Sequence, residues 1–259
     1  MDFEYFDPSP EIDFHGLKAL LRQLFDIDNQ LFDLSELTNM ILEQPLLGST
    51  VKCEGQESDP YAFLTVLNLQ EHRSKPIIQT LTKYLLGRAA RESSSMKDLS
   101  VLLDASSSGQ VGLILTERLI NMPHQIVPSM YKMLLEEIRW ANDAKEPYQF
   151  THYLIISKTY TEVESKVDVE DDRPQKKTKK GGKGVAETFY FHPEDEALHK
   201  HALAHVEFEY SKEGGEGASD AKRAFQEAGV KPQGHLILIE AGKFEAAVKA
   251  VEEYLGAES

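Results

Sequence analysis

The sequence contains one cysteine, and no apolar run approaches the roughly 18 residues that a membrane-spanning helix needs. A single cysteine, Cys53, excludes an internal disulfide and a thiolate metal cage, which fits a reducing compartment. The residues before Lys18, the first basic residue, carry only acidic charges, the opposite of a signal peptide's basic start. We therefore expect a soluble nuclear and cytoplasmic protein that does not bind membranes.

Basic residues are scarce relative to acidic ones: 28 Lys and Arg against 43 Asp and Glu, so the net charge is −15. A chain this acidic repels phosphate backbones, so direct nucleic-acid binding is not expected, and its long-range field favours basic partners. Apolar residues make up 41% and charged residues 27%, near the values of globular proteins, so bulk disorder is excluded. The 259 residues suffice for one large or two small domains with a buried core.

Motifs that mark common catalytic sites are missing. The sequence contains no Walker sequence, no serine elbow and no HExxH run. The segment from Gly109 to Gly112 enters an expected strand rather than leaving one, whereas a phosphate-binding loop needs glycines between a strand and a helix N-terminus. Cys53 has no identifiable base for a Cys–His site. We therefore expect no catalytic residues, no enzyme activity and no cofactor.

Helical and strand patterns alternate along the chain. The first expected helix follows Asp13, a candidate cap, and its apolar residues recur at helical spacing from Leu17 to Phe25. Further helices are expected from Asp33 to Pro45, from Pro76, up to Leu103, from Pro128 and from Phe244 to Leu255, and strands at 61–69, 111–115, 150–160, 188–191, 203–210 and 235–240. The alternation predicts an α/β fold with a central mixed sheet, in a single domain over residues 1–259.

Residues 162–186 differ from the rest of the chain because they contain almost nothing apolar. Six acidic residues precede six basic ones, the composition of a flexible charged insertion. A dense basic run in such a segment fits the acidic groove of an importin-type receptor, although it could also be a solvated loop that offsets the preceding acids. We predict a nuclear-localisation signal at Lys176, Lys177, Lys179 and Lys180.

A metal site is suggested by four histidines close in sequence: His192, His199, His201 and His205. On a helix His201 and His205 would share a face, but the alternation around Val206 indicates that His205 lies on a strand. Zinc also needs ligands fixed by neighbouring groups, and no such groups are identifiable. We therefore interpret these histidines as polar surface residues and predict no metal site.

The segment 111–131, VGLILTERLINMPHQIVPSMY, carries a specific pattern: a strand, an E-R-x-I-N-x-P turn and a P-x-M-Y helix start. Here the chain resembles the BCCIP/BCP protein family, in its fungal-type branch. The likeness continues in YLIISKTY at 153–160, in the helix from Gly16 to Phe25 and in the final strand–helix pair. The matching residues of the turn and helix start are Glu117, Arg118, Ile120, Asn121, Pro123, Ile126, Pro128, Met130 and Tyr131.

The resemblance implies a fold similar to GCN5-related acetyltransferases, a twisted mixed sheet with helices on both faces, in a family not known for acetyl transfer. The acetyltransferase cofactor loop has the pattern Q/R-x-x-G-x-G/A. The nearest match here, Gln226, Gly229 and Lys231, fails at the last position, where a small residue is needed for close approach to a pyrophosphate. An acetyltransferase-like enzyme or cofactor-binding protein remains the alternative.

The resemblance also implies a nuclear protein that shuttles with the cytoplasm. Its expected roles are nuclear export, protein transport and chaperoning of universal protein fourteen, a basic ribosomal protein of the large subunit, during 60S assembly. Its expected partners are that protein, nuclear transport receptors and a phosphatidylinositol-phosphate kinase, with further links to actin organisation and vesicle transport. An acidic binder can screen a basic ribosomal protein until delivery. A general acidic histone-type chaperone is a second alternative.

Two acidic surfaces are candidate contacts for a basic client: the N-terminal segment, expected to be an edge strand or docking arm, and the outer face of the strand 203–210. The candidate contact residues are Glu4, Asp7, Glu11, Glu207 and Glu209. The turn itself is interpreted as structural, because an Asn-x-Pro turn needs hydrogen bonds of its own. Its residues are Glu117, Arg118, Asn121 and Pro123.

Overall fold

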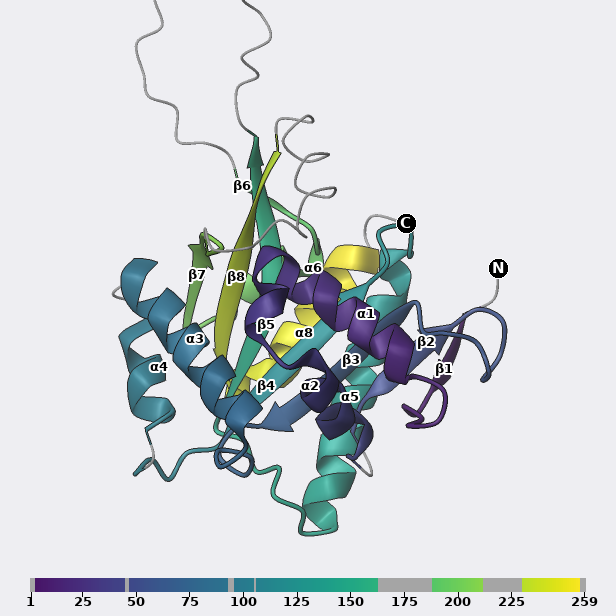
Figure 1. Ribbon diagram of the computed structural model, residues 1–259, viewed down its shortest axis with the longest axis horizontal. Helices are drawn as coiled ribbons and strands as arrows, with labels where there is room; N and C mark the ends of the chain where they lie inside the picture. Colours follow the sequence, from purple (N-terminus) through teal and green to yellow (C-terminus); the bar gives the residue numbers. More distant parts are fainter. Residues whose placement is uncertain are drawn as a thin grey trace, which may run out of the picture.

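The computed structural model shows a central sheet between two layers of helices (Figure 1). It describes residues 3–44, 47–92, 96–104, 106–162, 188–211 and 230–256. The predicted localisation signal (Lys176, Lys177, Lys179 and Lys180), nearly all of the insertion 162–186, and Gln226 and Gly229 lie outside the described residues.

Eight strands form the sheet, in the order β1-β2-β3-β4-β5-β8-β7, and β6 also pairs with β5. The strands are β1 (Glu4–Phe6), β2 (Ser49–Lys52), β3 (Ala62–Asn68), β4 (Val111–Arg118), β5 (His152–Glu162), β6 (Thr188–Tyr190), β7 (Ala204–Phe208) and β8 (Val230–Glu240). The pair β4–β5 is parallel and the other pairs are antiparallel. The predicted mixed sheet is therefore confirmed.

Helices cover both faces of this sheet, and each layer buries its own apolar cluster. The first layer holds α1 (Phe14–Phe25), α2 (Leu34–Leu42), α3 (Pro76–Glu92) and α4 (Lys97–Leu102), and the second holds α5 (Val127–Asp143), α6 (Glu194–His199) and α8 (Ala241–Gly256). Short 3₁₀ helices, η1 (Asp26–Leu31) and η3 (His124–Ile126), follow α1 and precede α5. Among these described helices, none has both the length and the apolar character needed to cross a bilayer.

Most predicted elements are present, and the differences have local causes. β3 is buried along its whole length, as its continuous apolar run predicts. Neither β2 nor α6 is predicted from the sequence, because four and six residues are too few to show a period. Asp13 precedes α1 but does not cap it with its side chain. Instead the Asp13 carboxylate pairs with the Lys52 ammonium at 2.6 Å, and both side chains are fully buried.

The sheet divides beside β5. β4 pairs with β5 only up to Leu115 opposite Ile156, while its last residues continue to pair with β3. From Thr159 onward, β6 takes the place beside β5. A gap in strand pairing therefore opens between the end of β4 and β6, and charged side chains are buried at this split.

Candidate functional site

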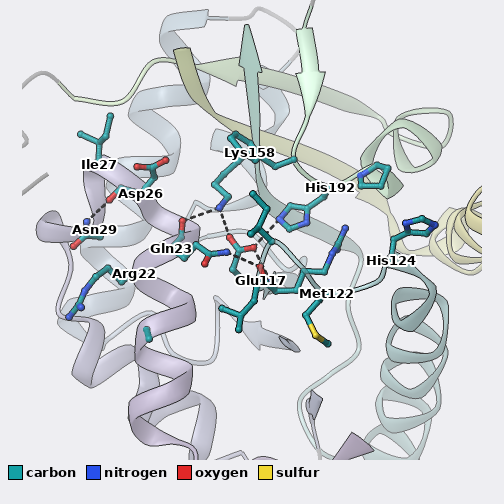
Figure 2. A pocket seen from close by; sticks show the side chains of 16 residues that line it. Arg22, Gln23, Asp26, Ile27, Asn29, Glu117, Met122, His124, Lys158 and His192 are labelled. Atoms are coloured by element: carbon teal, nitrogen blue, oxygen red, sulfur yellow. Dashed lines mark hydrogen bonds and ion pairs between the residues drawn. The ribbon is translucent and has the colours of Figure 1, made fainter. Parts of the chain in front are cut away.

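Charged groups from three separate segments meet at the split between β4 and β6 (Figure 2). Glu117 is the centre: its carboxylate lies 2.6 Å from the Lys158 ammonium and 3.2 Å from His192 Nε2. Lys158 stands on β5, in the register position that faces the end of β4, and its Nζ also donates to the Gln23 carbonyl oxygen at 3.1 Å. The helix α1 is thereby joined to the sheet through this buried charge.

A second ion pair extends the arrangement to α6. The Arg118 guanidinium donates to both carboxylate oxygens of Glu194, at 2.5 and 3.0 Å, in the bidentate geometry that arginine favours. His192 Nδ1 lies 3.8 Å from the same carboxylate. We refer to these five residues as the buried charge cluster. They are Glu117, Arg118, Lys158, His192 and Glu194, each at most 9% exposed.

The charges in the cluster neutralise one another. Burial alone would raise the pKa of Glu117, but His192 and Lys158 outweigh that effect and hold the pKa at about 2. Likewise, Arg118 and His192 overcome the effect of burial on Glu194 and keep its pKa below the ordinary value. Carboxylates held ionised by direct partners are poor general bases at neutral pH. The cluster therefore fits a structural role, joining α1, β4, β5 and α6.

Above the cluster lies a pocket of about 690 Å³, lined by α1, η1 and the turn after β4. The predicted structural turn forms one wall: Met122 N donates to the Leu119 carbonyl oxygen at 2.9 Å and closes it. The hydrogen bond that closes the turn is therefore made by the backbone, and Asn121 is exposed. Ile120 is 90% exposed beside the pocket. Glu117 and Arg118 occupy the floor as members of the cluster, whereas Pro123 is half-buried.

A second, acidic pocket of about 350 Å³ lies between α5 and the segments that flank β1 and β2. We define the acidic pocket by four of its lining residues: Asp7, Glu136, Glu137 and Trp140. Trp140, the only tryptophan in the sequence, is 61% exposed. Asp7 and Glu136 are exposed, and among the described residues neither has an ion pair. The pocket therefore combines available carboxylates with an exposed indole ring.

Glu137 forms the buried part of this pocket. Its carboxylate accepts hydrogen bonds from Gly48 N at 2.8 Å and from Ser49 Oγ at 3.5 Å, which links α5 to the start of β2. Burial raises the pKa of Glu137, against the lowering effect of the Gly48 bond. Sequence reasoning missed these α5 residues. The sequence signal that could have identified Glu137 is its position on the apolar face of α5, one turn after Leu134.

The acidic residues predicted to bind a client do not form one surface. Because β1 and β7 are the two edges of the sheet, the two groups lie about 30 Å apart at ordinary strand spacing. Glu4, Asp7 and Glu11 are exposed at the β1 edge, as the predicted edge strand requires, and Asp7 belongs to the acidic pocket. At the other edge, the Glu209 carboxylate is paired with Lys231, and Glu207 lies beside His205 and His235.

The histidines also differ from the sequence prediction. His192 is buried in the charge cluster, so its interpretation as a surface residue is wrong. His205 does lie on a strand, as the alternation predicts. The structure brings His199 and His205 together with His235, a residue of β8 that sequence spacing did not indicate, and does not place His201 in this group.

Comparison with known proteins gives consistent matches. The sequence model of the BCCIP family matches residues 1–198. Protein bcp1 of Aspergillus fumigatus is 62% identical over 255 residues, covering 98% of this chain and 87% of that protein. Protein bcp1 of Schizosaccharomyces pombe is 49% identical over 259 residues, covering 99% and 90%. The crystal structure of BCP1 from Saccharomyces cerevisiae matches with a TM-score of 0.67 at 28% identity, covering 97% of this chain and 88% of that one.

Proposed function

The chain belongs to the BCCIP family, and from this premise we propose that it is a non-catalytic escort of a basic protein. The proposed client is universal protein fourteen of the large ribosomal subunit, which the chain would carry between nucleus and cytoplasm with the help of nuclear transport receptors. This role belongs to ribosome assembly and protein transport.

The acidic pocket is the observation that carries this proposal. Exposed carboxylates of Asp7 and Glu136 can pair with lysine or arginine side chains, and the Trp140 ring can hold a cation over its face. Aromatic residues and arginine are common at the energetic centres of protein interfaces. A basic protein segment is therefore the partner that suits this surface best.

The charge of the whole chain supports the same partner. The basic residues between Arg173 and Lys183 lie together in the insertion, and without those six bases 22 basic residues face 43 acidic ones. The remaining charge of −21 would attract a basic client from a distance and speed its association.

An acetyltransferase-like enzyme or cofactor-binding protein is the main rival, because the family resemblance implies a related fold. In this structure Lys231 stands within β8, and the carboxylates of the buried charge cluster are engaged by cations. We expect acetyl-CoA to leave the melting temperature unchanged in a thermal-shift assay. A genuine cofactor at about 100 times its dissociation constant would stabilise the protein by about 2.7 kcal/mol. A shift of that size would support the rival.

A general histone-type chaperone is the second rival. Equal amounts of histones and universal protein fourteen should compete for the chain, and we expect the ribosomal protein to be retained. Preferential retention of histones would favour the rival. The competition separates recognition of one client from attraction to any basic protein.

Nuclear import is expected to depend on the basic run in the insertion. Replacing Lys176, Lys177, Lys179 and Lys180 with alanine should make a large fluorescent fusion more cytoplasmic, because an importin-type groove needs these ammonium groups. The fusion must be large because a 29.2 kDa chain alone can diffuse through pores. Fluorescence microscopy measures the nuclear fraction.

The matched control removes the same number of charges elsewhere. The control variant replaces four exposed lysines with alanine: Lys83, Lys132, Lys243 and Lys249. The control fusion should stay nuclear, and both variants should retain the melting temperature of the wild type within a few degrees. Equal nuclear accumulation of all three proteins would contradict the localisation proposal.

A further inference from the structure

Three histidine rings meet at the β7 edge of the sheet, outside both pockets. His199 is the last residue of α6, and the other two project from neighbouring strands: His205 from β7 and His235 from β8. One ring nitrogen from each residue lies within 4.8 Å of those of the other two. Because Glu207 pairs with His235 in the strand register, its carboxylate lies beside the same group.

The closest contact joins His199 Nε2 to His235 Nε2, at 2.6 Å. Burial, together with the neighbouring His205, lowers the pKa of His199 to about 4. Burial, with the other two histidines, also lowers the pKa of His235 well below its ordinary value. Two ring nitrogens this close cannot both direct an N–H at the other, so at least one Nε2 offers the lone pair that a metal ion binds.

The opposite ring nitrogens face groups that can fix the orientation of each ring. Glu207 Oε1 lies 3.6 Å from His235 Nδ1 and 3.8 Å from His205 Nδ1, and the Tyr190 hydroxyl lies 3.4 Å from His199 Nδ1. Nδ1 of each ring thus has a polar group within 3.8 Å, although His235 Nδ1 makes no hydrogen bond to the described residues, and Nε2 of His199 and of His235 face each other. Metal-binding histidines show this arrangement, with a carboxylate or other acceptor behind the ring.

We propose that His199, His205 and His235 bind one Zn²⁺ ion through their Nε2 atoms, with Glu207 as the outer carboxylate and water in the fourth position. Three imidazoles suit a divalent transition metal such as zinc, whereas calcium and magnesium prefer oxygen ligands. The neutral histidine pair without metal is the alternative, in which one ring donates a hydrogen bond to the other.

Small movements of the three histidine side chains would bring their ring nitrogens to the positions of tetrahedral zinc ligands. Zinc–nitrogen bonds of about 2.0–2.1 Å place tetrahedral ligands roughly 3.3 Å apart, so the contact between His199 and His235 must widen slightly. The ring of His205 stacks on that of His199, with centroids 3.9 Å apart, and must turn out of the stack. The His205 side chain is 44% exposed, so it is free to turn, and the ion can enter from its side.

This inference does not depend on the escort proposal, because the histidine site and the acidic pocket lie at opposite edges of the sheet. It revises the prediction from sequence that the chain has no metal site. The sequence suggested His201 and His205 as neighbours on a helix, whereas the strand pairing replaces His201 with His235.

Cobalt titration of the full chain tests the site. The protein is prepared without a histidine tag, treated with a chelator and dialysed, and Co²⁺ is then added while visible absorption is recorded. We expect one Co²⁺ per chain with the intense bands of a tetrahedral ion, and displacement of Co²⁺ by one equivalent of Zn²⁺. His205→Ala, which removes an exposed ligand and should preserve the fold, is expected to abolish these bands.

Two further variants separate ligands from neighbours. Glu207→Gln should weaken zinc binding about 10–100-fold, the effect of removing an outer partner. His201→Ala, close in sequence but outside the group, should bind like the wild type. Absence of stoichiometric zinc in equilibrium dialysis, or equal binding by His205→Ala and the wild type, would overturn the proposal.

Discussion

Replacing Glu117 with alanine is expected to lower the free energy of unfolding by about 3–5 kcal/mol, the cost of breaking a buried ion pair on one side. Glu117 is 1% exposed and is the anion closest to both Lys158 and His192. Without it, the Lys158 ammonium keeps the Gln23 carbonyl oxygen and the Phe191 ring, 5.3 Å from its Nζ, but has no other carboxylate within ion-pair distance among the described residues. Urea denaturation followed by circular dichroism measures the loss.

A double substitution provides the control for this result. Glu117→Leu combined with Lys158→Met removes both charges and fills similar volume, so it should destabilise less than the sum of the single substitutions. Equal stability of Glu117→Ala and the wild type would show that the cluster does not join the layers.

The same residue makes stability fall in acid. The folded pKa of Glu117, about 2, is depressed below the ordinary value of 4.5. The unfolded chain therefore binds more protons between these values, and the stabilisation is present above about pH 4.5 and is lost as the pH falls towards 2. The Glu117→Ala variant should lack this part of the acid sensitivity.

Replacing Asp195 with asparagine is expected to stabilise the protein above pH 7. Asp195 is buried at the start of α6, where its carboxylate accepts a hydrogen bond from Ser157 Oγ at 2.5 Å. Burial raises its pKa from 3.8 to about 7, despite opposing effects of His192 and Ser157. The folded protein therefore binds more protons than the unfolded chain between these values, and stability contributed by this group falls as the pH rises from about 4 to 7.

The neutral asparagine avoids this penalty and can still accept the Ser157 hydrogen bond. A displacement of about three pKa units corresponds to about 4 kcal/mol, the upper limit of the expected gain at pH 8. Urea denaturation between pH 4 and pH 8 measures the slope. Glu196→Gln, an exposed neighbour on the same helix, is the control and should keep the wild-type slope. A loss of stability in Asp195→Asn at pH 8 would contradict the account of this residue.

The sequence predicts most of the fold because long apolar patterns determine the larger elements. The buried run of β3 and the helical face of α5 are visible in the sequence and recur in the structure. The sites are less predictable, because they depend on pairing between distant segments. Glu117 meets Lys158 only where β4 runs parallel to β5, and His235 on β8 meets His199 only when folding brings the end of α6 to it. No local spacing encodes either contact.

The charged candidates illustrate the same limit. Net charge predicts a basic partner but not the surface that binds it, because composition contains no positions. Folding places the two predicted acidic groups at opposite edges and adds Glu136 and Trp140 from α5 to Asp7. The acidic pocket is therefore a product of tertiary structure.

Client binding at the acidic pocket is tested most directly by fluorescence anisotropy of labelled universal protein fourteen, titrated with the chain at low and physiological salt. We predict a stable complex whose association slows as salt rises, because steering charges are screened beyond about 8 Å at physiological ionic strength. The triple variant Asp7→Asn, Glu136→Gln and Trp140→Ala should bind about tenfold more weakly, a loss of about 1.4 kcal/mol. The control Glu57→Gln and Glu71→Gln, which removes two exposed acids outside the pocket, should bind nearly as tightly as the wild type. The proposed function would be contradicted by the absence of any complex. It would also be contradicted by an affinity that is independent of salt and equal for the triple variant and the control.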